Sequence, residues 1–139
     1  RYAMPLKNGN LLADPQVKWC LYDWGRGFQS DVDLADGVVD AAAWLPAYDD
    51  RTQCVLKFAQ PVTFSRVVFY SPTIKTAELD IMVNGQWQTL HKWPEQYRNE
   101  FSYQGEAVTT DQLRIRPTAN RQGYGSWCYP EITELGIFR

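Results

Sequence analysis

Residues 78–90 read ELDIMVNGQWQTL, and this stretch indicates the fold class most directly. In its first half, three aliphatic residues alternate with Asp80 and Met82, which is the pattern of a strand with one buried face. Asn84-Gly85 follows and supplies the two positive-φ positions of a type I′ turn. The last five residues, QWQTL, return as a second strand. The stretch therefore predicts a β-hairpin.

The chain before this hairpin also has the pattern of β-strands. From Cys54 to Phe58, every second residue is predicted to face the core. The stretch RVVFY from Arg66 to Tyr70 is apolar at consecutive positions, which suits a central strand covered on both faces. Pro61 and Pro72 are expected to mark the turns on either side of this strand.

The second half of the chain continues the β pattern. Leu113 and Ile115 alternate with Arg114 and Arg116, which predicts a strand whose two arginines lie on a solvated face, and Pro117 is expected to end it. A last strand is predicted near residues 132–138, and a short helix at residues 40–44 (DAAAW), stopped by Pro46. About eight short strands with turn signals between them predict an all-β fold, a β-sandwich of the jelly-roll kind.

Length and charge exclude several classes of function. The 139 residues have the size of one domain, which is expected to span residues 1–139. The net charge of −2 gives no electrostatic basis for binding nucleic acid or an anionic membrane. No apolar run approaches the ~18 residues of a spanning helix, so membrane insertion is not expected. Aromatic residues make up 14% of the chain, and this unusual content suggests a binding surface.

Three cysteines allow one disulfide and one leftover thiol. Cys20 and Cys128 both lie among aromatic residues near the ends of the chain, which favours that pair over pairs with Cys54. Three reduced, buried thiols are an equally open alternative. With a single histidine and no CxxC motif, the sequence does not predict a zinc site.

The order of these segments resembles the discoidin-like (coagulation factor V/VIII C-type) domains and the related family 32 carbohydrate-binding modules. The resemblance covers residues 33–138 and leaves residues 1–18 as a leading segment. It implies a β-sandwich of the galactose-binding-domain-like kind. The segments that carry it are DLADG (33–37) with Trp44, CVLKFAQPVTFSRVVFY (54–70), ELDIMVNGQWQTL (78–90), VTTDQLRIRPT (108–118) and EITELGIF (131–138).

The resemblance also implies a structural Ca²⁺. Its side-chain ligands would be Asp36, from the Asp-Gly pair, and Glu134, which opens the last strand. Loop carbonyls, including those of Asp33 and Val38, would complete the six to eight oxygens that Ca²⁺ takes. The family usually has Thr before the tryptophan, where this chain has alanines, and a solvated acidic loop without a metal ion is the alternative.

Sugar rings present C–H patches that stack on aromatic side chains, while their hydroxyl groups need fixed polar partners. Three loops of this chain combine aromatic with polar residues, at 22–28, 47–51 and 120–127. Members of the family that bind galactose usually carry a histidine and an arginine where this chain has Leu45 and Thr73, so another arginine would have to supply that contact. The predicted sugar-binding residues are Trp24, Arg26, Tyr48, Arg121, Tyr124, Trp127 and Tyr129.

These observations predict a non-catalytic carbohydrate-binding module that binds a polysaccharide or glycan. Because the chain starts at Arg1, it is expected to be an excised or processed part of a larger secreted enzyme or adhesin, extracellular or at the cell surface, with a covalently linked catalytic domain. Enzymatic activity is not expected, because His91 is the single histidine and no carboxylate pair sits in a recognisable catalytic frame. The alternatives are a discoidin-like protein- or phospholipid-binding module and a ligand-free structural accessory domain.

Overall fold

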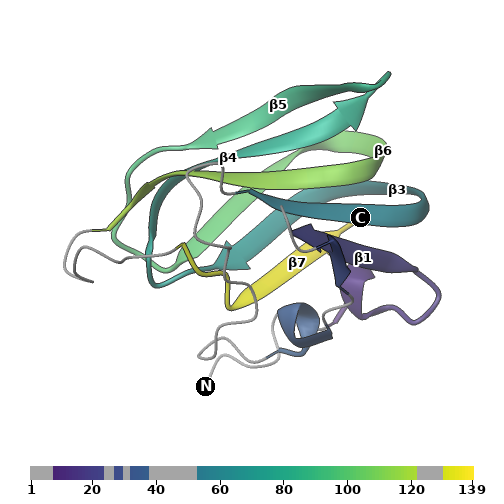
Figure 1. The fold of residues 1–139 in the computed structure, drawn as a ribbon, viewed down its shortest axis with the longest axis horizontal. Helices are drawn as coiled ribbons and strands as arrows, with labels where there is room; N and C mark the ends of the chain where they lie inside the picture. Colours follow the sequence, from purple (N-terminus) through teal and green to yellow (C-terminus); the bar gives the residue numbers. More distant parts are fainter. Residues whose placement is uncertain (1–7, 24–26, 30–31, 38–52, 122–129) are drawn as a thin grey trace.

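The computed structural model describes residues 8–23, 27–29, 32–37, 53–121 and 130–139. Within these residues the chain forms antiparallel strands and two short 3₁₀ helices (Figure 1). The elements in order are η1 (Leu11–Ala13), β1 (Trp19–Asp23), β2 (Gly27–Gln29), η2 (Val32–Ala35), β3 (Cys54–Tyr70), β4 (Ile74–Val83), β5 (Gln86–Trp93), β6 (Glu100–Asn120) and β7 (Glu134–Phe138). In this part of the chain, no helix is long and apolar enough to cross a membrane.

The two long strands, β3 and β6, run through both layers of a β-sandwich. Residues 54–57 of β3 pair with β1 and with residues 112–115 of β6, and β4 and β5 extend that layer. After breaks in register, residues 66–70 of β3 pair with β7 and with residues 100–104 of β6. The antiparallel sheet therefore folds over on itself, which confirms the predicted all-β sandwich.

Aromatic side chains pack between the two layers. Phe69 of β3 stacks on its neighbour Phe101 of β6 with ring centroids 4.6 Å apart, and Trp93 of β5 meets Phe69 edge-on at 5.1 Å. The pattern of alternation in β4 is also confirmed, because Leu79 and Ile81 are buried. The largest fully buried side chains are Phe64, Phe69, Phe101, Leu11, Leu21, Leu34, Leu56, Ile74, Leu79, Leu113 and Ile115.

The predicted hairpin is confirmed, with Asn84 at φ +51° and Gly85 at φ +78° between β4 and β5. Two predicted strand ends are wrong. Pro61 lies inside β3, in the register break between Lys57 and Val62, and Pro117 lies inside β6 beside the break at residues 76–77 of β4. Proline cannot donate a backbone hydrogen bond, and an irregular position in a strand accommodates it without a turn.

The later part of the leading segment packs against the sandwich. The Asn10 side chain is buried, donates through Nδ2 to the Leu135 carbonyl at 3.0 Å, and accepts through Oδ1 from the Ile137 N–H at 3.0 Å. Leu11 and Leu12 join the core. Asn10 thus satisfies backbone groups on the edge of β7 that does not pair with β3, as a neighbouring strand would do.

Two sequence predictions concern residues that the structure does not describe, or describes in part. The predicted helix at residues 40–44 lies outside the described residues. Cys20 carries a free thiol, so the favoured Cys20–Cys128 disulfide is not formed in this structure, and Cys128 itself lies outside the described residues. Cys54 is buried in β3.

Candidate functional site

One end of the sandwich is organised by the turn at residues 71–73, which joins β3 to β4. The buried Ser71 hydroxyl accepts the N–H groups of Thr73 (3.1 Å) and Ile74 (2.9 Å), which fixes the turn from within. At the same end, the Thr133 N–H donates to the Tyr70 carbonyl at 2.9 Å and brings the start of β7 alongside. This end, with the ends of β5 and β6, lies on the left in Figure 1.

Thr73 occupies the position at which galactose-binding members of the family that this chain resembles carry an arginine. In this chain Thr73 holds neighbouring backbone segments together. It is 2% exposed. Its carbonyl accepts the Arg121 N–H at 2.8 Å, and its hydroxyl accepts the Glu131 N–H at 2.8 Å. Thr73 therefore holds Arg121 and Glu131 close to each other at this end of the sandwich.

Arg121 is the predicted sugar-binding residue that the structure describes. Its Nη1 donates to Asn99 Oδ1 at 2.7 Å and to the Pro72 carbonyl at 3.5 Å, and its Nη2 donates to the Arg98 carbonyl. The guanidinium thus reaches the turn at 71–73 from another strand and joins it to the loop that precedes β6. Arg121 therefore holds the turn and the loop together, and its contact with a sugar stays a prediction.

Residues 94–99 form the β5–β6 loop, which is bonded to the same turn. The Ser71 N–H donates to the Asn99 carbonyl at 2.9 Å, and Gln96 Nε2 donates to the carbonyls of Arg98 (2.8 Å) and Glu100 (2.6 Å). Within the described part of the chain, Tyr97 is the large hydrophobic side chain that stands exposed, at 88%. The sequence interpretation missed it. The available signal was an aromatic residue three positions after Pro94, in a loop that follows a predicted hairpin.

The other predicted sugar-binding residues remain predictions. Trp24, Arg26, Tyr48, Tyr124, Trp127 and Tyr129 lie outside the described residues.

The structure brings the two predicted calcium ligands to one place. The N–H of Gly37, which follows Asp36, donates to Glu134 Oε2 at 2.7 Å across 97 positions of sequence. Gly37 has φ +88°, a conformation that favours glycine. Glu134 is fully buried and Asp36 is half-buried. A buried carboxylate is stable only with hydrogen-bond donors or positive charge beside it, and hard oxygen ligands are the ones that Ca²⁺ prefers.

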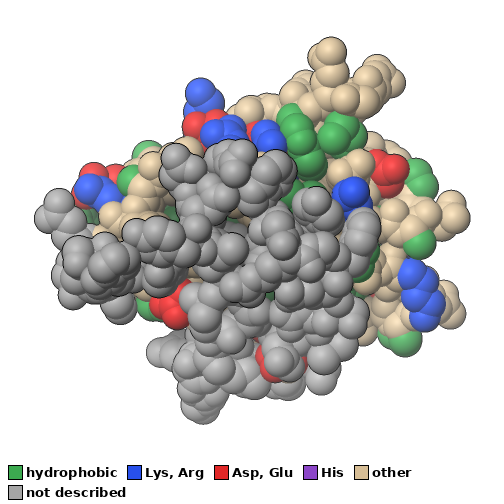
Figure 2. Space-filling model, in the orientation of Figure 1, with side chains coloured by type: hydrophobic (Ala, Val, Ile, Leu, Met, Phe, Trp, Pro, Cys, Tyr) green, Lys and Arg blue, Asp and Glu red, His purple; other side chains and the backbone are tan. Residues whose placement is uncertain are grey.

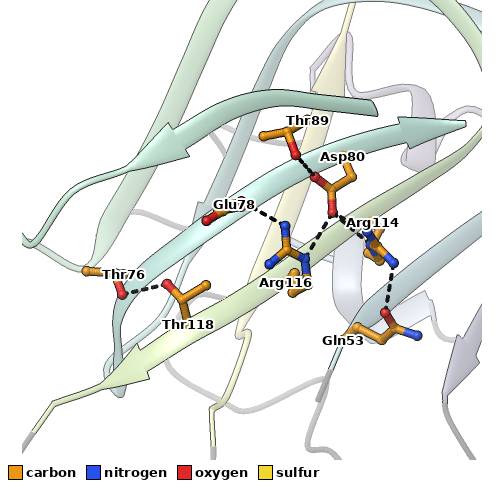
Figure 3. A network of polar contacts seen from close by, with 8 residues as sticks. All are labelled: Gln53, Thr76, Glu78, Asp80, Thr89, Arg114, Arg116 and Thr118. Atoms are coloured by element: carbon orange, nitrogen blue, oxygen red, sulfur yellow. Dashed lines mark hydrogen bonds and ion pairs between the residues drawn. The ribbon is translucent and has the colours of Figure 1, made fainter. Parts of the chain in front are cut away.

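A second polar group lies on the sheet formed by β4, β5 and β6 (Figure 3). Asp80 is fully buried and accepts from Thr89 Oγ1 (2.8 Å), Arg114 Nε (2.8 Å) and Arg116 Nε (3.2 Å). Arg116 also binds Glu78 at 2.7 Å. Burial opposes ionisation of Asp80, but the hydrogen bonds from Thr89, Arg116 and Arg114 outweigh it and hold the pKa of Asp80 below its usual value.

The two arginines of this sheet face are therefore not simply solvated, which corrects the sequence prediction. The Arg114 side chain is 15% exposed, binds Gln53 Oε1 through Nη1 at 3.1 Å, and lies over the Trp87 ring at 4.3 Å. The two arginines balance Asp80 and Glu78, so the group carries no net charge. Figure 2 shows the same mixing more widely, with basic side chains beside acidic ones along the upper part of this face.

Several solved structures that share this fold are named as family 32 carbohydrate-binding modules. The module CpGH89CBM32-6 produced by Clostridium perfringens matches over 94% of this chain and 98% of its own, with a TM-score of 0.69 and 15% sequence identity. This chain has the fold of the family 32 carbohydrate-binding modules. The family 32 module of Streptococcus pneumoniae EndoD (TM-score 0.67, 11% identity, 94% of this chain and 99% of that chain) agrees. So does the GH31 module CBM32-2 bound to GalNAc (TM-score 0.63, 14% identity, 89% and 99%).

The same family 32-like fold also forms part of larger enzymes. The match to SpGH29 covers 99% of this chain but only 29% of that chain, with a TM-score of 0.66 and 17% identity. The match to a Ruminococcus gnavus GH29 fucosidase covers 94% of this chain and 26% of the enzyme, with a TM-score of 0.68 and 14% identity. No protein-family model and no curated protein matches the sequence.

Proposed function

We propose that this chain is a non-catalytic module that binds a polysaccharide or glycan. The observation that carries the proposal is the match over nearly the whole length of free-standing family 32 modules, one of them bound to GalNAc. The organised end of the sandwich supports it, because the turn at 71–73, the β5–β6 loop and Arg121 form a fixed support for ligand-binding loops. Binding loops on a rigid scaffold are the usual arrangement in such folds.

The polar group on the β4–β6 face does not compete as a ligand site. All three nitrogens of the Arg114 guanidinium have partners in the chain, and Asp80 is fully buried. A ligand on this face would have to displace these contacts, whereas the loop end carries the exposed side chain of Tyr97. We therefore expect the ligand at the end of the sandwich that carries the turn at 71–73, the β5–β6 loop and Arg121.

A polysaccharide-panel affinity gel tests the proposal. The wild-type module runs beside Tyr124→Ala and Trp127→Ala, the two aromatic residues predicted for the third loop. At least one polysaccharide is expected to retard the wild type, and at least one substitution is expected to weaken that retardation. If neither substitution changes the retardation, the third loop is not the binding loop.

We further propose that the module is attached to a catalytic domain of a secreted enzyme and acts by proximity. Several matches of this chain lie within enzymes several times its length. A module that holds a polysaccharide near a linked catalytic domain raises the effective concentration of substrate without a new chemical step. Its own affinity need only be weak, because stacking and a few hydrogen bonds are offset by ordering of the sugar.

Calcium bound at Asp36 and Glu134 is the remaining part of the proposal. The hydrogen bond from the Gly37 N–H to Glu134 supports it, because it holds the residue next to Asp36 against the first residue of β7. Among the described residues, no group of three or more His, Cys, Asp or Glu is placed to hold a metal ion, so backbone carbonyls would supply further oxygen ligands. A chelator should lower the melting temperature and Ca²⁺ restore it, with no response in Asp36→Asn. An unchanged melting temperature after chelation would show that Asp36 and Glu134 are not calcium ligands.

A further inference from the structure

We propose that Tyr97 is an aromatic platform on which a sugar ring stacks, with Arg98 beside it as a hydrogen-bond donor. The inference rests on the proposed function, because it names contact residues at the same end of the sandwich. The ligand class is a pyranose ring that presents a C–H face to the tyrosine and hydroxyl groups to the neighbouring guanidinium. Such a ring gains from stacking and from fixed polar partners together.

The exposure of Tyr97 is unusual for its size, at 88%. Single exposed apolar residues are common on protein surfaces and need no function. Within the described residues, however, the other large hydrophobic side chains are at least partly covered. The distinguishing feature is the backbone that carries the ring, because a platform must be held in place before its ligand arrives.

The β5–β6 loop is held on both sides of Tyr97. On the N-terminal side, Gln96 Nε2 donates to two carbonyls, those of Arg98 and Glu100. On the C-terminal side, Arg121 donates to the Arg98 carbonyl and to the Asn99 side chain. The buried turn then holds the loop through the Ser71 N–H. A ring on a loop that is already ordered binds without the entropy loss of ordering it, which favours even weak ligands.

Arg98 gives this aromatic surface a polar neighbour. Its side chain is 83% exposed, and its Nη2 lies 3.5 Å from Glu100 Oε1. A guanidinium has five N–H donors, and this loose contact uses one of them. Glu100 is held in turn by the Tyr70 hydroxyl at 3.1 Å. The loop therefore offers an exposed ring and charge-assisted donors on consecutive residues, which is the combination that a sugar requires.

Affinity electrophoresis of four proteins tests the inference on a polysaccharide that retards the wild type. Tyr97→Ala is expected to raise the dissociation constant about threefold to tenfold, the range that a lost aromatic stack gives. Tyr97→Phe keeps the ring and should bind within about twofold of wild type. Gln88→Ala removes an exposed side chain on β5, away from the loop, and should bind as wild type. All four should melt together, because the altered side chains are exposed.

The outcomes separate this inference from the proposed function. If Tyr97→Ala is retarded as strongly as wild type, Tyr97 is not a platform, while the module still binds polysaccharide. If the wild type is retarded by no polysaccharide, both proposals fall. If Tyr97→Ala melts well below wild type, the ring packs against the protein and the inference is overturned.

Discussion

Arg114 and Arg121 show two uses of the same side chain in one small sandwich. On the β4–β6 face, Arg114 pairs with the charge of Asp80, which is fully buried. At the loop end, the bonds that fix Arg121 go to two carbonyls and an asparagine side chain, all of them uncharged. The first arrangement is an ion pair between strands of one layer, and the second is a brace between loops.

The difference between these two arginines indicates where a ligand can bind in this fold. A charge-balanced group with paired donors holds β4 and β6 together and has little left to offer a ligand. The hydrogen bonds of Arg121 to uncharged groups hold the loop in place. Other side chains of the loop, such as Tyr97, stay exposed and can contact a ligand. We therefore expect the sheet face to contribute mainly to stability and the loop end mainly to binding.

The largest effect is expected for Asp80→Asn. The substitution keeps the shape of the side chain but leaves two largely covered arginines without their buried counter-charge. Removing one partner of a buried pair typically costs about 3–5 kcal/mol, so the free energy of unfolding should fall by about 3 kcal/mol in a denaturant titration. Binding to polysaccharide, measured below the transition, should be unchanged.

Asp111→Asn is the matched control, because Asp111 lies exposed on β6. It should change the free energy of unfolding by less than about 0.5 kcal/mol. Equal effects of the two substitutions would show that the network on the sheet face contributes no special stability.

Arg121→Ala, in contrast to Asp80→Asn, should affect binding to polysaccharide more than it affects the free energy of unfolding. The loss of three hydrogen bonds to the loop end should lower the free energy of unfolding by about 1–2 kcal/mol. Because the β5–β6 loop loses its brace, retardation by polysaccharide should weaken strongly. Arg121→Lys keeps the charge but cannot bridge Asn99 and Arg98 in one plane, so it should be intermediate. Wild-type binding by Arg121→Ala would disprove the role of the brace.

Acid should lower the contribution of the Asp80 network on the sheet face to the free energy of unfolding. Since the pKa of Asp80 in the folded state lies below its ordinary value of 3.8, the network contributes fully above that value. Its contribution is lost as the pH falls from about 3.8 through the lower folded-state pKa. In melting curves recorded between pH 5 and pH 2, Asp80→Asn should show a shallower decline than wild type. Parallel declines would contradict the assignment.

The smallest expected effect is that of His91. Its ring lies between Trp93 and Tyr103, at 5.1 Å and 5.0 Å, and burial lowers its pKa from the usual 6.5. The unfolded chain then binds the proton more readily, so stability should fall by less than about 1 kcal/mol as the pH drops below 6.5. His91→Phe should remove this step between pH 7.5 and pH 5. A persisting step would point to another group.

Much of the fold follows from local pattern. The alternation around Asn84-Gly85 predicted β4, β5 and their turn, because the signals for a type I′ turn and for a half-buried strand both come from residues that are neighbours in sequence. The lengths of β3 and β6 did not follow. Pro61 and Pro117 are usual strand breakers, and only the register with partner strands shows that each sits at an irregularity instead.

The candidate site was predictable only in part. Asp36 and Glu134 were predicted as calcium ligands from a family resemblance; the structure shows the Gly37 N–H bonded to Glu134, and calcium binding stays a prediction. The ionic partner of the buried Asp80 is 34 positions away in sequence, and the bond that holds the loop next to Tyr97 comes from Arg121, 23 positions from Arg98; alternation carries no such information. The alternation of apolar and polar residues indicates on which face of the sheet a side chain lies. Whether that side chain is exposed to water depends on contacts with residues distant in sequence.

A ¹⁵N-resolved NMR titration with an oligosaccharide from the binding polysaccharide tests the central assignment most directly. We predict amide shift changes at Ser71, Thr73 and residues 95–99 and 120–121, and unchanged amides at residues 78–80 and 112–116 of the sheet face. Shift changes confined to the sheet face, with the loop end unmoved, would contradict it.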